Sequence, residues 1–162
     1  MLEELNLPFY GANVKTSGGR MLIQDVVRRK FVALTPEEWV RQHFVHYLMD
    51  EKGYPQERLA NEVALTLNGM TRRCDTVVYG VGAEGRLQPR MIIEYKRAGV
   101  EITQRVFDQI CRYNMVLQVD YLVVSNGLRH FCCKMNESRT GYVFLEDIPE
   151  WKDVKSGDER QK

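Results

Sequence analysis

Apolar residues along this chain recur at helix-like spacing in two stretches and at strand-like spacing in several others, which predicts a mixed α/β domain. The first helix should begin at Thr35, because Pro36 suits the first helical position and Glu38 stands where a capping box needs an acid. It should end near Gly53, since glycine commonly terminates helices in a left-handed conformation.

Three strands are predicted to follow, at residues 59–67, 72–79 and 88–96, because apolar and β-branched residues dominate each of them. Asn68–Gly69 is a hairpin-turn signal between the first two strands. The glycine-rich, charged stretch 80–89 indicates a hairpin loop between the last two. The three strands should therefore form a meander.

A second helix is predicted over residues 102–118, with Val106, Ile110 and Leu117 on its apolar face. The apolar run 120–125 indicates a further buried strand, which can join the sheet in parallel through a right-handed crossover. Two shorter strands are predicted after it, at residues 129–135 and 142–145. The order of elements is that of an αβββαβ sandwich, with a central mixed sheet flanked by helices.

The ends of the chain carry weaker patterns. Residues 1–34 are expected to form an N-terminal arm or edge strands, with a strand pair or a strand and loop within 21–32. Residues 35–151 should form one domain, because no linker composition divides them. Residues 152–162 are polar and are expected to fray.

Candidate chemistry appears where the third strand of the meander ends. Met91–Ile93 is apolar and unbroken, and it is followed at once by Glu94 and Lys96. Side chains two residues apart on a strand share a face, so this carboxylate and this ammonium should point the same way. Burying such groups costs free energy unless they have partners or a chemical task.

A second carboxylate, Asp75, heads the preceding strand, and the intervening loop can bring it beside Glu94. Two carboxylates together suit Mg²⁺, which prefers one or two of them plus waters and a phosphate. Lys96 could then position or help deprotonate an attacking water. An ordinary buried ion-pair network is the structural alternative for these three residues.

Composition narrows the class of protein only slightly. The chain has 23 basic and 22 acidic residues and a net charge of +1, whereas dedicated nucleic-acid binders usually carry more positive charge. It has neither a run of about 18 apolar residues nor a signal-peptide pattern, so we expect a cytoplasmic protein. Its four cysteines lack Cys-x-x-Cys spacing, which favours reduced structural thiols over a zinc site with His130.

These motifs resemble the signature of the PD-(D/E)xK nuclease superfamily, in which an acid precedes a Glu-x-Lys strand; here Asp75 comes nineteen positions before Glu94. Within that superfamily, the chain resembles the N-terminal nuclease domain of type I restriction enzyme R subunits. Further matches are the Gln-x-x-x-Tyr motif formed by Gln109 and Tyr113 and the Ser-Asn-Gly segment at residues 125–127. Cys74 departs from the pattern, which often has proline before the acid.

The resemblance implies a restriction-endonuclease-like fold in which Asp75 and Glu94 hold Mg²⁺, or Mn²⁺ in its place, and Lys96 serves the attacking water. It also implies that a glutamate of the first helix lies near the site, either Glu38 or Glu37. Glu62 is a weaker acidic candidate. The nucleic-acid contacts implied by motif or by position beside the site are Gln109, Tyr113, Arg73 and Arg97.

By this resemblance the protein is expected to be a Mg²⁺-dependent endonuclease that hydrolyses DNA, working alone, as a homodimer or with other restriction-modification subunits. The alternative is a non-catalytic module that binds nucleic acid or docks on a partner in a restriction or repair system. For Gln109 and Tyr113 the structural alternative is a solvated helix face, and for Asn126–Gly127 it is a type I′ turn.

Overall fold

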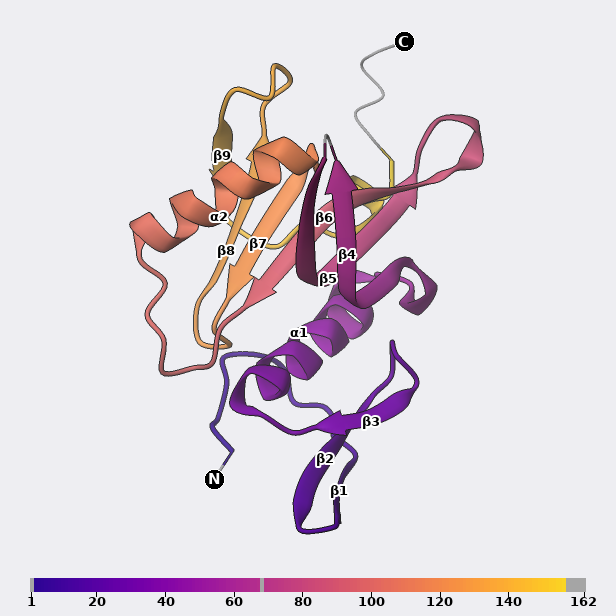
Figure 1. The fold of residues 1–162 in the computed structure, drawn as a ribbon, viewed down its shortest axis with the longest axis vertical. Coiled ribbons are helices and arrows are strands. Elements are labelled where there is room, and N and C mark those ends of the chain that lie inside the picture. Colours follow the sequence, from indigo (N-terminus) through magenta and orange to yellow (C-terminus); the bar gives the residue numbers. More distant parts are fainter. Residues whose placement is uncertain (1, 68, 157–162) are drawn as a thin grey trace.

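A central six-stranded sheet organises the computed structural model, which describes residues 2–67 and 69–156. Its strands lie in the order β4-β5-β6-β7-β8-β9 (Figure 1). Their bounds are β4 (Leu59–Leu67), β5 (Met70–Val81), β6 (Leu87–Tyr95), β7 (Tyr121–Ser125), β8 (His130–Met135) and β9 (Tyr142–Leu145). All six predicted strands of the sheet are therefore present, and the first runs over the predicted residues.

Two helices, α1 and α2, pack on this sheet, and three shorter helical segments lie elsewhere in the described chain. The helices are α1 (Pro36–Lys52), α2 (Gln104–Leu117) and α3 (Trp151–Val154), with 3₁₀ turns η1 (Gln56–Arg58) and η2 (Ala83–Gly85). A second sheet holds β1 (Val14–Ser17), β2 (Arg20–Asp25) and β3 (Lys30–Ala33), and α1 lies between this sheet and the central one (Figure 1). No described helix combines the length and apolar character needed to cross a bilayer.

The ends of α1 follow the sequence signals. The Thr35 hydroxyl accepts a hydrogen bond from the Glu38 backbone N–H at 3.0 Å, and Gly53 closes the helix in the left-handed conformation at φ 76°. The second half of the predicted capping box is wrong, because the Glu38 carboxylate turns away from the cap toward Arg28 and Arg41. Charged partners contributed by other segments prevail over the local motif here.

The meander and the crossover have the predicted topology. β4, β5 and β6 pair antiparallel in sequence, and β7 joins β6 in parallel after α2. The predicted Asn68–Gly69 turn falls partly outside the described residues, and Gly69 has the positive φ of 77° that such a turn requires. The structure is thus a restriction-endonuclease-like α/β sandwich around a mixed sheet.

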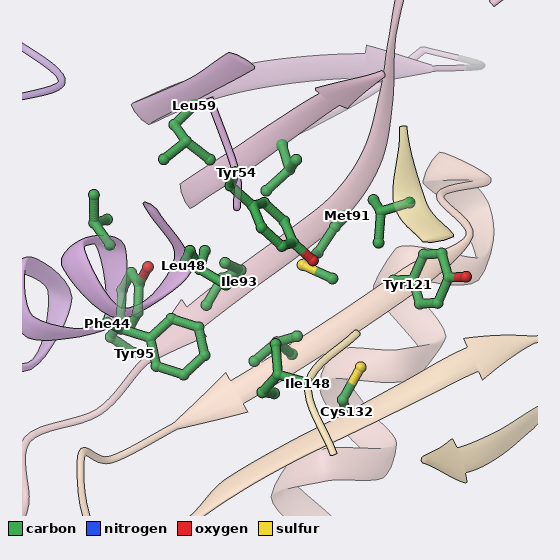
Figure 2. Packing of buried hydrophobic residues seen from close by; sticks show 14 of the residues in the cluster. Phe44, Leu48, Tyr54, Leu59, Met91, Ile93, Tyr95, Tyr121, Cys132 and Ile148 are labelled. Carbon is green, nitrogen blue, oxygen red and sulfur yellow. The ribbon is translucent and has the colours of Figure 1, made fainter. Parts of the chain in front are cut away.

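The main core lies between α1 and one face of the central sheet (Figure 2). Phe44 and Leu48 of α1 pack over Met91, Ile93 and Tyr95 of β6, all of them buried. The predicted burial of residues 91–93 is therefore confirmed. Since β6 is an inner strand of the sheet, the polar groups that are buried near its end need partners inside the protein.

α2 covers the opposite face of the sheet, with a buried stripe that overlaps the predicted one only in part. Its Phe107 and Cys111 are buried and Ile110 packs against the same cluster, whereas Val106 is half-buried and the Leu117 side chain lies outside the described residues. Phe107 packs against aromatic rings of β8 and β9. These distant rings decide which apolar stripe turns inward, and periodicity alone does not contain that information.

Four further expectations can be compared with the structure. The strand pair within 21–32 is present as β2 and β3, and β1 extends it into a separate sheet. The expected fraying of 152–156 is wrong, because Val154 is buried in the main core; residues 157–162 lie outside the described part. The turn after β7 is not type I′, because Gly127 but not Asn126 has positive φ. All four cysteines are free and buried.

Candidate active site

Three acids stand in a row across the neighbouring strands β4, β5 and β6. The β4–β5 register pairs Asn61 with Thr76, which places Glu62 opposite Asp75. The β5–β6 register pairs Thr76 with Ile93, which places Asp75 opposite Glu94. Residues directly opposite one another on antiparallel strands have Cβ atoms about 5 Å apart. The structure thus brings together the two carboxylates that the sequence separates by nineteen positions.

Asp75 and Glu94 interact directly. Burial first, and then the negative charge of Asp75 and a hydrogen bond with its carboxyl group, raise the pKa of the Glu94 carboxyl to about 7. Arg72 opposes this shift with its Nη2 atom 2.8 Å from Glu94 Oε1. This contact is an ion pair whose geometry leaves Oε1 without a hydrogen bond. Asp75 Oδ2 accepts from the Tyr95 backbone N–H at 2.9 Å.

Glu94→Gln is expected to stabilise the metal-free protein at pH 8 by about 3 kcal/mol. The folded-state pKa of Glu94, about 7, exceeds its ordinary value of 4.5. Between these values the folded protein retains a proton that the unfolded chain releases, so stability falls as the pH rises through the window. The amide carries no charge and removes this loss.

Urea unfolding of both proteins in chelator at pH 5 and pH 8 measures the effect. The difference in unfolding free energy between variant and wild type should grow with pH. Equal pH dependence in the two proteins contradicts the assignment of the raised pKa to Glu94.

The backbone of Lys96 is held by the end of β7. Its backbone N–H donates to the Ser125 carbonyl at 2.8 Å, and the following Asn126 donates from Nδ2 to the Val100 carbonyl at 2.8 Å. Asn126 Oδ1 also accepts from two backbone N–H groups of its own turn. The Ser-Asn-Gly segment therefore fixes both ends of the loop that leaves Lys96.

Of the two glutamates in the first turn of α1, Glu37 is the one whose pKa responds to the charges of Asp75 and Lys96. Burial and the negative charge of Asp75 raise its pKa, while the positive charges of Lys96 and Arg41 oppose the rise. Glu38 instead lies behind the acidic row. Its Oε2 accepts from Arg41 Nε at 2.5 Å, and its Oε1 accepts from Arg28.

Both Glu38 oxygens are thus occupied by guanidinium groups, and its carboxylate is buried. A direct catalytic role for Glu38 stays a prediction, and these contacts favour a supporting role. Glu37 lies one residue earlier on α1, and its carboxyl group interacts electrostatically with Asp75 and Lys96.

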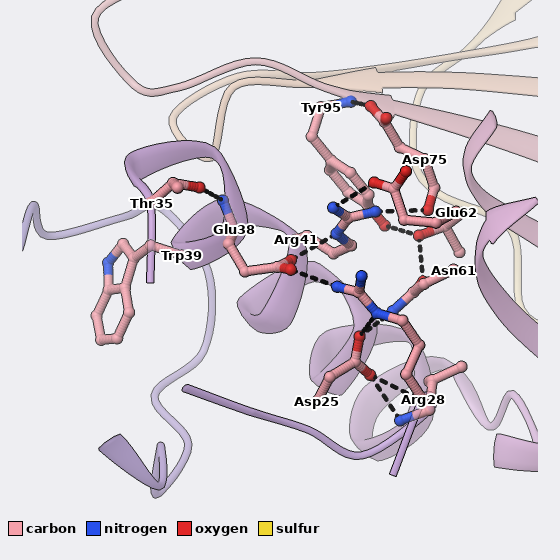
Figure 3. Close-up of polar contacts among 12 residues, drawn as sticks. Asp25, Arg28, Thr35, Glu38, Trp39, Arg41, Asn61, Glu62, Asp75 and Tyr95 are labelled. Carbon is pink, nitrogen blue, oxygen red and sulfur yellow. Dashed lines mark hydrogen bonds and ion pairs between the residues drawn. The ribbon is translucent and has the colours of Figure 1, made fainter. Parts of the chain in front are cut away.

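Arg41 is the residue that sequence reasoning missed. Its Nη1 donates to the Asp75 backbone carbonyl at 2.8 Å and its Nη2 to Glu62 Oε1 at 2.7 Å, in addition to the bond with Glu38 (Figure 3). The available signal was an arginine three residues after Glu38, the spacing at which helical side chains meet. Its two contacts with β4 and β5 could not be seen in the sequence.

Glu62 is engaged on both oxygens, because Arg73 Nε donates to its Oε2 at 2.7 Å. Its backbone adopts φ 57°, a conformation uncommon for glutamate that is often retained near functional sites. Glu62 is therefore in the row, but its carboxylate is already neutralised. Arg73 keeps 70% of its side chain exposed.

The remaining predicted nucleic-acid contacts lie at the surface or outside the described side chains. Gln109 on α2 and Arg97 after β6 are exposed. The Tyr113 side chain lies outside the described part. Their role in nucleic-acid contact stays a prediction.

The residues present fit a small divalent cation held by two carboxylates. Within the described part of the chain no group of three or more His, Cys, Asp and Glu side chains forms a metal cluster. Mg²⁺ does not require one, since protein sites commonly give it one or two carboxylates and leave water and phosphate to complete the shell. The negative charge of Asp75 raises the pKa of Glu94, as expected for two adjoining carboxyl groups, and such a pair of oxygen donors suits a divalent cation.

This sheet, with an acid on one strand and Glu-x-Lys ending the next, defines a restriction-endonuclease-like domain. Residues 36–149 match the family model of the type I restriction enzyme R protein N terminus. The chain belongs to this family. No curated protein and no solved structure gives a significant match.

Proposed function

We propose that this domain hydrolyses phosphodiester bonds in DNA as a Mg²⁺-dependent endonuclease. The observation that carries the proposal is the placement of Asp75 and Glu94 on the paired strands β5 and β6, with Lys96 one residue beyond the end of β6. Membership of the R-protein family supports DNA as the substrate and restriction-modification subunits as partners.

The residues of the chain would divide the work as follows. Asp75 and Glu94 would hold the cation, which when bound stabilises charge developing on the phosphate and lowers the pKa of an attacking water. Lys96 would orient that water, or assist its deprotonation, from the end of β6. Glu37 interacts electrostatically with Asp75 and Lys96 and would help to position the attacking water. Arg41 keeps the Asp75 backbone in place through its carbonyl.

Plasmid cleavage in Mg²⁺ or Mn²⁺ tests the proposal. We expect nicked or linear DNA with wild-type protein, none in chelator, and none with Asp75→Asn. Asp50→Asn is the matched control, because Asp50 is an exposed acid near the far end of α1 and should leave cleavage unchanged. Loss of cleavage in both variants would show a general effect of removing an acid.

One observation favours a second candidate, a DNA-docking module without catalysis. The Arg72 guanidinium already stands 2.8 Å from Glu94, where it partly supplies the positive charge that a metal would bring. This candidate predicts DNA binding without cleavage in Mg²⁺, Mn²⁺ or Co²⁺, and binding that does not change in Lys96→Ala.

A further inference from the structure

The carboxylate of Asp25, at the end of β2, is fully buried and carries four hydrogen bonds. Its Oδ1 accepts from the backbone N–H groups of Val27 and Arg28 at 2.8 and 2.9 Å. Its Oδ2 accepts from Arg28 Nε and from Asn61 Nδ2, the latter at 2.9 Å. Burial alone would raise its pKa, but these donors hold the pKa below its ordinary value. A buried carboxylate this well satisfied is a fixed anchor.

One polar route leads from Asp25 through the sheet to the acidic row. Asn61 receives a hydrogen bond from the Thr76 hydroxyl at 2.7 Å, and Thr76 receives one from the Tyr95 hydroxyl at 2.9 Å. The backbone N–H of the same Tyr95 donates to Asp75 Oδ2 at 2.9 Å. The side chains of Asp25, Asn61, Thr76 and Tyr95 are buried, and the route ends on the half-buried carboxylate of Asp75.

A second route leads from Asp25 through α1. Arg28 bridges Asp25 and Glu38 with its guanidinium, and Glu38 in turn accepts from Arg41 Nε at 2.5 Å. Arg41 Nη1 then donates to the backbone carbonyl of Asp75 at 2.8 Å. Figure 3 shows this chain of alternating charges running from the N-terminal segment to the sheet. It ends on the main chain of Asp75.

The two routes form a closed ring, because both begin at Asp25 and both end at Asp75. The route through the sheet ends in a hydrogen bond to the Asp75 carboxylate, and the route through α1 ends in one to the Asp75 backbone carbonyl. Together these bonds restrict the orientation of Asp75. Tyr95 also lies between Glu94 and Lys96, so the same ring restrains the strand end that carries them. Groups that orient a metal ligand from behind commonly alter metal affinity or activity 10- to 100-fold when changed.

We propose that Asp25 is a positioning residue for the metal-binding carboxylate of Asp75, so that the N-terminal sheet is part of the active domain. Asp25 and Arg28 precede residues 36–149, the segment that matches the family. Through this ring, a segment that precedes the family domain helps to position Asp75, which lies within that domain. This inference rests on the proposed function, because it assumes that Asp75 binds a divalent cation.

Calorimetric titration of the full chain with Mn²⁺ tests the inference without depending on cleavage. Asp25→Asn puts an amide donor where Arg28 or Asn61 already donates, and should weaken Mn²⁺ binding about 10-fold. Ile23→Ala is the matched control, because Ile23 is a buried residue of the same strand that is apolar and so has no polar side-chain group to join the ring. It should destabilise the sheet yet bind Mn²⁺ like wild type. Asp75→Ala should show no binding. Circular dichroism verifies that each variant is folded.

Two milder variants keep the test decisive where Asp25→Asn does not fold. Tyr95→Phe removes one hydroxyl and opens only the route through the sheet, and should weaken Mn²⁺ binding by a factor of about 3. Arg28→Lys keeps the charge but cannot bridge Asp25 and Glu38 with a planar fork. Weaker binding in either variant supports the ring, and unchanged binding in both overturns it.

The outcomes separate this inference from the proposed function. A folded Asp25→Asn protein that binds Mn²⁺ like wild type, while Asp75→Ala does not bind, overturns the role of Asp25 alone. Equal weakening in Ile23→Ala also overturns it, because the effect is then one of general stability. Unchanged Mn²⁺ binding in Asp75→Ala rejects the metal site itself.

Discussion

Lys96→Met should lower the rate of DNA cleavage by about 10²–10⁴-fold, the range typical of losing a group that assists proton transfer. Methionine keeps the length and apolar stem of the side chain but removes the ammonium. The backbone bond from residue 96 to Ser125 does not depend on the side chain, so the strand end should stay in place. DNA affinity in chelator should change little, because one charge contributes only part of the phosphate contacts.

Single-turnover cleavage and fluorescence anisotropy on the same duplex measure the two effects separately. Lys152→Met is the control, because Lys152 is an exposed lysine of α3 that pairs only loosely with Glu150, at 3.4 Å. Equal cleavage by Lys96→Met and wild type removes Lys96 from the mechanism. Loss of binding together with cleavage would show instead that Lys96 holds the DNA.

Arg41→Met is expected to destabilise the protein by about 3–5 kcal/mol, the range for removing one partner from a buried charged cluster. The substitution leaves the Asp75 carbonyl without its donor and leaves both Glu38 and Glu62 short of a cation. Since Arg41 itself is buried, solvent cannot replace the lost contacts. Urea unfolding measures the change.

Arg73→Met offers a matched comparison, because Arg73 binds the same Glu62 from a largely exposed position. Its loss should cost less than about 1 kcal/mol, as for most exposed ion pairs. Similar losses in the two variants would show that the contacts of Arg41 with Glu38 and Asp75 add nothing beyond a surface pair.

The pairing of Asp75 with Glu94 was predictable because both residues lie on strands that are consecutive in the sequence. It also depends on which face of each strand a residue occupies, and the alternation of side chains along a strand gives that face. Asp75 and Glu94 stand on consecutive strands joined by one loop, so a single register decides whether they meet. That the Lys96 side chain shares the face of Glu94 stays a prediction from the two-residue repeat of a strand. Helix α1 was predictable from Thr35 and Gly53, since its end signals lie within one turn of its ends.

What the sequence could not supply depends on contacts between distant segments. Glu37 and Glu38 both lie in the first turn of α1, and only the arginines reaching Glu38 from two sides tell them apart. Asp25 belongs to no motif of the sequence, and its hydrogen bond with Asn61 joins residues that are 36 positions apart. The orientation of α2 was decided by rings of β8 and β9 that come later in the chain.

The bridge from Arg28 to Glu38 joins the family domain to the segment before it. Glu38 receives one cation from Arg41, inside the matched segment, and a second from Arg28, in the turn between β2 and β3 and outside that segment. The family domain of this protein therefore depends on the residues before it for one of the two positive charges that neutralise a buried carboxylate of α1.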